Sequence, residues 1–69
     1  MQGAIHTINP RELYGLIDVG ESYQYYFKAD DVVGGRSAFH KLHVGDLVTF
    51  EDTGEEMMGG QLMRAEKVK

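Results

Sequence analysis

The stretch LYGLIDVGESYQYYFKADDV, Leu13 to Val32, contains all four tyrosines of the chain and decides the expected fold. Two runs of alternating apolar and polar residues flank the short Gly20–Ser22 segment, a pattern that predicts an antiparallel hairpin. Successive side chains of a strand point to opposite faces. The face on which each aromatic ring lies therefore decides whether it is part of the core or of a surface.

Alternation places two of the tyrosines away from the core. Tyr14 shares one side of its strand with Leu16, and Tyr26 shares one side of the next strand with Lys28. Because a lysine does not suit a core face, we expect these four residues to form an exposed patch. Two interpretations remain open. The patch is a stacking platform with a cation for phosphate, or its tyrosines only stabilise the sheet surface through cross-strand pairs of roughly 0.2–1 kcal/mol.

The rest of the chain predicts more short strands separated by turns. Asn9-Pro10-Arg11-Glu12 forms a turn, because proline fixes its own φ and excludes helix at the residue before it. Short strands with glycine-bearing turns indicate a small closed or nearly closed β-barrel. The further expected elements are strands at Gly3–Asn9, Leu47–Asp52 (Val48 and Phe50 inward) and Gln61–Val68, loops at Gly34–Ser37 and Thr53–Gly60, and a turn or short helical piece at Ala38–His43.

Composition sets the limits of size and function. The 69 residues make one small domain, 1–69, near the lower end of what folds on a single core. The chain has no cysteine, so neither disulfides nor thiolate metal sites stabilise it. A net charge of -4 argues against a broad polyanion clamp but not against single-strand binding through base stacking. No signal peptide or apolar run of about 18 residues is present, so we expect a soluble cytoplasmic protein that does not contact membranes.

Several motifs resemble those of the cold-shock domain family along essentially the whole chain. ELYGLI (Glu12–Ile17) is similar to the family's KGFGFI run, and YYFKADDV (Tyr25–Val32) is similar to its VFVHFSAI run. VGDLVTFE (Val44–Glu51) and the late Gly60-Gln61 pair agree as well. The resemblance implies an all-β fold, a five-stranded antiparallel OB-type barrel that binds single-stranded RNA or DNA.

The departures from the family lie mainly at its binding positions. Three positions at which the family carries stacking rings hold Thr7, Leu16 and Ala29 here. Glu12 reverses the charge of a family lysine, and Leu13 replaces a glycine. Since each stacked base contributes about 1–3 kcal/mol, we expect binding that is weaker or altered in specificity.

The resemblance also implies roles for individual residues. Phe39 has two open interpretations, a stacking ring or a cover for one end of the barrel. His6 is either a rim contact or an exposed strand histidine without a role. The expected nucleic-acid-binding residues are Tyr14, Tyr26 and Phe39 for stacking, Lys28 and Asn9 for polar contacts, Gln61 as a weaker family carry-over, and His6 and Arg36 at the rim.

No motif indicates catalysis, so we expect a non-enzyme that acts passively as a nucleic-acid chaperone without a cofactor. His40 and His43 lack a further ligand at fixed spacing, so we expect no metal site. The alternative is an OB-fold protein-interaction module that has lost nucleic-acid binding and contacts a protein partner or forms a homodimer. Met57-Met58 supports this alternative if both thioethers are exposed, but not if one fills the barrel.

Overall fold

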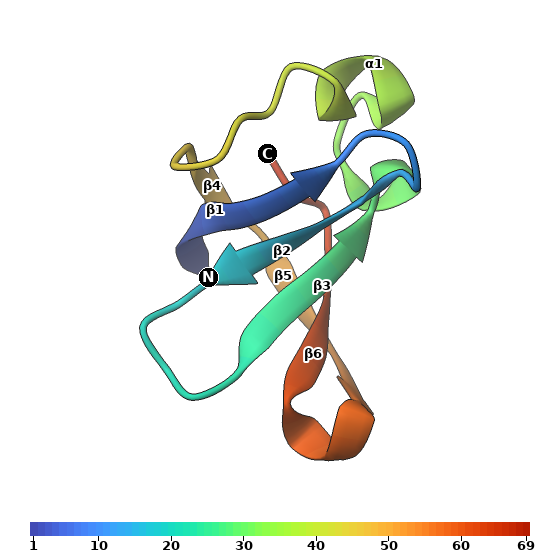
Figure 1. Cartoon of the computed structure of the whole chain (residues 1–69). Coiled ribbons are helices and arrows are strands. Elements are labelled where there is room, and N and C mark those ends of the chain that lie inside the picture. The colour runs from blue at the N-terminus through green and yellow to red at the C-terminus, as the bar shows by residue number, and fades with distance from the viewer.

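The computed structural model describes all residues from 1 to 69 and shows a small all-β domain (Figure 1). The strands are short, as the spacing of turn residues predicts. The elements in chain order are β1 (Gln2–Asn9), β2 (Tyr14–Asp18), β3 (Gln24–Lys28), the 3-10 turn η1 (Ala29–Asp31), α1 (Gly35–Phe39), β4 (Leu47–Thr49), β5 (Glu51–Met57), the 3-10 turn η2 (Met58–Gly60) and β6 (Leu62–Glu66).

The inward residues of the strands form one core, and they follow the predicted alternation. In β3, Tyr25 and Phe27 are buried while Tyr26 between them is not. The predicted inward pair Val48 and Phe50 is also buried. The other core residues are Ile5, Ile17, Ala29, Val32, Phe39, Ala65 and Val68.

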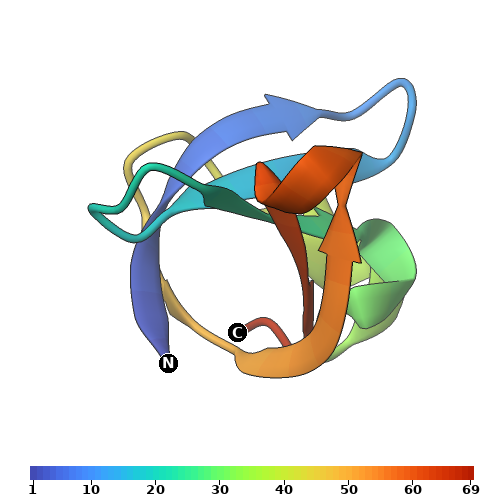
Figure 2. The same ribbon diagram turned by 90° about the horizontal axis from the view of Figure 1, so that it is seen from below.

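The strands form one curled mixed sheet in the order β4-β1-β2-β3-β6-β5. Every pairing in this sheet is antiparallel except that between β3 and β6, which is parallel. Figure 2 shows the strands curving into a ring when the molecule is seen from below. The expectation of five antiparallel strands is therefore wrong in its detail, while the all-β barrel-like character is confirmed.

The predicted strand at Leu47–Asp52 divides at Phe50, because its two halves pair with different neighbours. β4 pairs with β1, whereas β5 pairs with β6. Phe50 itself exchanges two hydrogen bonds with Met1, whose amino group donates to the Phe50 carbonyl at 2.8 Å and whose carbonyl accepts from the Phe50 N–H at 2.9 Å. The two outermost strands of the sheet are thus one residue apart in the chain, which explains the curl.

The segment from Thr53 to Gly60, expected as a loop, is partly strand. β5 continues to Met57 but loses its register with β6 between Asp52 and Glu56. Gly54 lies in this irregularity with φ of 85°, and its N–H donates to the Asp52 carboxylate. This bulge bends β5 without ending it.

The helix α1 begins earlier than the sequence predicts and lies at one end of the barrel, with η2 at the other (Figure 1). It starts within the expected Gly34–Ser37 loop and ends at Phe39, whose ring is fully buried. None of the helices has the length and apolar character required to cross a bilayer.

Candidate nucleic-acid interface

Tyr14 and Tyr26 lie next to each other on the outer face of the sheet. Tyr14 is opposite Lys28 and Leu16 is opposite Tyr26 in the β2–β3 register, so all four side chains share one side. The two rings stack with centroids 5.5 Å apart and planes inclined by 24°. Such a pair contributes about 0.5–1.5 kcal/mol beyond burial, and both residues keep part of their surface exposed. The sequence therefore predicted the patch correctly.

β1 extends this face by one strand. Its register with β2 shifts between Ile5 and Thr7, which leaves His6 as an extra residue in a β-bulge. His6 is exposed and its Nδ1 lies 2.7 Å from the Thr7 hydroxyl. Leu16 is opposite Thr7 and Tyr26 in the two neighbouring strands. His6 thus lies at the edge of the tyrosine patch, where the sequence placed it.

A shallow hollow of about 270 Å³ adjoins the tyrosine pair. Tyr26, Lys28 and Arg36 line it together with two acidic residues, Glu12 and Asp30. Neither Lys28 nor Arg36 forms an ion pair within the chain. The hollow brings together three residues expected at the site and supplies two cations, while the two carboxylates oppose a phosphate.

Asn9 supports the turn beside the patch. Its side-chain oxygen accepts a hydrogen bond from the Glu12 N–H at 2.9 Å, and its carbonyl accepts one from the Leu13 N–H. Leu13, which replaces the glycine of the resembled family, has φ of 61°, a left-handed conformation that costs a non-glycine residue about 1–2 kcal/mol. The Asn9 side chain thus has a structural role in the turn that holds Tyr14.

Phe39 does not belong to the surface. Its ring is 0% exposed and meets the Phe27 ring edge-on at a centroid distance of 6.2 Å. The expected stacking role is therefore corrected, because α1 directs this side chain into the end of the barrel. Of the two interpretations, covering the core is the one the structure bears out.

Gln61 lines a separate hollow of about 440 Å³ with Gln24, Met58 and Leu62, and not the hollow beside the tyrosines. Met58 is 69% exposed there, and Met57 is half-buried. Neither methionine fills the barrel interior. Gln61 therefore adjoins the outer face at the end of β3 opposite to Lys28.

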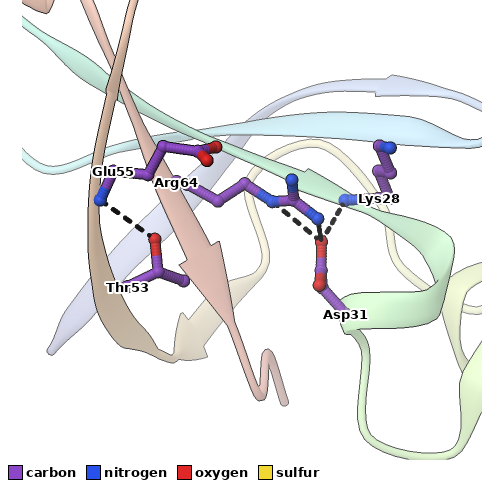
Figure 3. Close-up of polar contacts among 5 residues, drawn as sticks. All are labelled: Lys28, Asp31, Thr53, Glu55 and Arg64. Carbon is purple, nitrogen blue, oxygen red and sulfur yellow. Dashed lines mark hydrogen bonds and ion pairs between the residues drawn. The ribbon is translucent and has the colours of Figure 1, made fainter.

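Arg64 is a member of the outer face that the sequence did not reveal. It is paired with Tyr26 across the parallel β3–β6 register, and its guanidinium carbon lies 5.8 Å from the Tyr26 ring centroid. Asp31 Oδ2 accepts hydrogen bonds from Arg64 Nη2 at 2.7 Å and Nε at 3.2 Å, and a third from the Lys28 backbone N–H at 2.8 Å (Figure 3). Tyr26 and Arg64 are far apart in the sequence, so no local pattern of residues indicates that their strands pair.

Outside this face lie two exposed histidines and one buried tyrosine whose pKa is shifted. His40 and His43 are both exposed, and no group of three or more His, Asp or Glu side chains is placed to hold a metal ion. Burial, helped by the hydroxyl's hydrogen bond to Asp52 and the charge of that carboxylate, raises the pKa of Tyr25 to about 12. Tyr25 faces inward, so this shift concerns stability.

The comparisons with known proteins do not assign the chain to a family. No family model matches it, and no curated protein matches it in sequence. A function for the chain is therefore inferred from the residues of the outer face and their geometry.

Proposed function

We propose that the protein binds short single-stranded nucleic acid, RNA or DNA, on the outer face of β1, β2 and β3, and that its barrel is of the OB type found in cold-shock domains. The observation that carries this proposal is the outward Tyr14–Tyr26 pair beside Lys28. Unpaired bases stack on aromatic side chains whatever their sequence. If Tyr14 and Tyr26 served only to stabilise the sheet surface, an unpaired lysine beside them would not be needed.

The charges around the pair suit a flexible single strand better than a duplex. Lys28 and Arg36 offer two cations to a phosphate, while Glu12 and Asp30 in the same hollow repel it. Duplex binding draws its affinity from many simultaneous phosphate contacts. With a net charge of -4, the chain offers too few cations for that mode, and stacking supplies most of the affinity.

Two rings instead of three or more imply weak binding. Phe39 is in the core, and Thr7 and Leu16 occupy the outer face where the resembled family carries rings. At about 1–3 kcal/mol per stacked base, a surface of two rings that already stack on each other holds one or two bases and releases them readily. Such a protein acts passively by trapping unstacked bases and needs no cofactor or catalytic group.

The test is a fluorescence-anisotropy titration of labelled oligo-dT and oligo-U of about six nucleotides at low and moderate salt. Tyr14→Ala and Tyr26→Ala should each weaken binding about fivefold to a hundredfold. Tyr14→Phe and Tyr26→Phe are the matched controls, because they keep the ring, and they should bind within about twofold of the native chain.

Lys28→Ala should weaken binding and reduce its salt dependence, since it removes a phosphate contact. Lys41→Ala is its control, because Lys41 is also an exposed lysine but does not line the hollow. Absence of binding at low salt, or alanine variants that bind like the native chain, contradicts the proposal.

One observation favours the alternative, a protein-interaction module. Leu47 in β4 is 72% exposed, and Val44 in the loop before β4 is also exposed. Large apolar side chains exposed near one another in the chain are a feature of contact surfaces for other proteins. Leu47→Ser should abolish a protein contact, measured as self-association by sedimentation, and should leave oligonucleotide binding unchanged.

A further inference from the structure

The ion pair between Arg64 and Asp31 suggests how the affinity of the outer face is set. The inference rests on the proposed function, because it concerns the same surface. Arg64 lies in β6 beside Tyr26, on the side of β3 away from Tyr14, which comes from β2. Its neighbour Ala65 is buried, so the arginine points outward with Tyr26.

Both hydrogen bonds of the arginine go to one oxygen of the carboxylate. Nε and Nη2 donate to Asp31 Oδ2, so three of the five guanidinium N–H donors have no partner within the chain. The Arg64 side chain keeps 23% of its surface exposed and the Asp31 side chain 17%. The arginine side chain is therefore partly accessible, yet its charge is offset by the adjacent carboxylate.

The fold holds Asp31 firmly in this place. Asp31 Oδ2 accepts the Lys28 N–H at the end of β3, and the Asp31 carbonyl accepts the Val68 N–H at 2.9 Å. Bonds to the chain at two points fix the carboxylate between β3 and the end of the chain beyond β6. Arg64 thus meets a fixed anion, against which a phosphate of a bound strand must compete.

We propose that Arg64 is a further nucleic-acid contact of this surface and that Asp31 restrains it, so that the Asp31 carboxylate lowers the affinity for single strands. Arginine binds phosphate through its planar fork of donors and also stacks against aromatic rings and bases. With the carboxylate removed, the guanidinium stays beside Tyr26 and donates to the phosphate of a base stacked there. The strand then gains one phosphate contact.

Asp31→Asn tests this directly, since the asparagine oxygen still accepts the Lys28 N–H. Measured with the same oligo-dT, it should bind about tenfold more tightly than the native chain. The slope of log K against log salt should steepen by about 0.7, the value for one added phosphate contact on a single strand. Asp31→Ser also keeps an acceptor at this position and should behave alike, so the test does not depend on the folding of one variant.

Asp30→Asn is the matched control. It removes the same charge from the adjacent residue, which lines the hollow but pairs with no arginine. It should raise affinity less than Asp31→Asn and leave the salt slope nearly unchanged. In the background of Arg64→Gln, the gain from Asp31→Asn should disappear.

The outcomes separate this inference from the proposed function. If the native chain binds through Tyr14 and Tyr26 but Asp31→Asn gains no more than Asp30→Asn, or gains equally without Arg64, only the inference is overturned. Binding by Asp31→Asn that requires Arg64 supports it, even where the native chain binds below detection. If neither the native chain nor Asp31→Asn binds, both proposals fail.

Discussion

Tyr25 and Tyr26 occupy adjacent positions of one strand, yet Tyr25 packs in the core and Tyr26 lies on the outer face. Tyr25 is 2% exposed, meets the Phe50 ring at 4.7 Å between centroids and donates its hydroxyl hydrogen to Asp52 at 2.8 Å. Tyr26 faces outward between Tyr14 and Arg64, and its hydroxyl has no hydrogen-bond partner in the chain. The inner face of the sheet therefore consists of packed core side chains, whereas the outer face carries exposed aromatic and charged groups.

The largest effect that separates the two faces is expected from Phe39→Ala. A fully buried phenylalanine costs about 3–5 kcal/mol when truncated, and a chain of this length has only about 3–10 kcal/mol of stability in total. Guanidinium unfolding followed by circular dichroism should show a largely unfolded variant at room temperature. Ser37→Ala, exposed in the same helix, should change the free energy of unfolding by less than about 0.5 kcal/mol. A Phe39→Ala variant that is stable but has lost oligonucleotide binding would contradict the core position of Phe39 and would indicate that it belongs to the surface site.

The next largest effect is expected from Gly15→Ala, which adds one methyl group to the inner face. A Cβ at this position would lie 2.5 Å from the Phe27 ring and 2.9 Å from the Thr7 carbonyl oxygen. Overpacking of this kind costs about 1–3 kcal/mol. Adding Phe27→Leu, which shortens the opposing side chain, should recover part of that loss in denaturant unfolding. A Gly15→Ala variant as stable as the native chain would contradict the close packing of Gly15 against the Phe27 ring.

A smaller effect is expected from Tyr25→Phe, with Tyr26→Phe as its matched control. Loss of the buried hydroxyl should reduce the free energy of unfolding by about 1 kcal/mol, whereas the outward substitution should change it by less than about 0.5 kcal/mol. Thermal and denaturant unfolding of the two variants show how much one hydroxyl group contributes to stability on each face of the sheet. Equal losses would contradict the assignment of the two tyrosines.

The pH dependence of the Tyr25→Phe effect follows from the raised pKa. The folded pKa of about 12 lies above the unfolded value of 10.0, because burial and Asp52 both disfavour the phenolate. The contribution of Tyr25 is therefore complete below pH 10 and is lost as the pH rises toward 12. The stability difference between the native chain and Tyr25→Phe should shrink across that window, and a constant difference would contradict the shift.

Much of the fold follows from local alternation and turn residues. The strand predicted at Gly3–Asn9 and the hairpin predicted on either side of Gly20–Ser22 agree with β1, β2 and β3, because one face of each strand is buried and fixes the register. The division at Phe50 was not predictable in this way, since it arises from a change of partner strand and not from a change of pattern. The parallel β3–β6 pairing likewise depends on contacts between distant parts of the chain.

The candidate site was predicted to a similar extent. Tyr14, Tyr26 and Lys28 were assigned correctly to one outer face, because strand alternation decides it. Phe39 was expected at the site with covering of the barrel end left open as the alternative, since a short helix at the barrel end has no alternation to show which way a ring points. Arg64 was missed for a different reason, as only the folded register brings it to Tyr26.

The most direct test of the central claim is aromatic carbon–proton NMR of the four tyrosine rings during titration with oligo-dT. The outward pair Tyr14 and Tyr26 should shift strongly from ring currents of the stacked bases, while the signals of buried Tyr25 and of Tyr23, which packs against the core, stay nearly fixed. Unchanged Tyr14 and Tyr26 signals at saturating oligonucleotide would contradict the claim that these two rings form the binding surface.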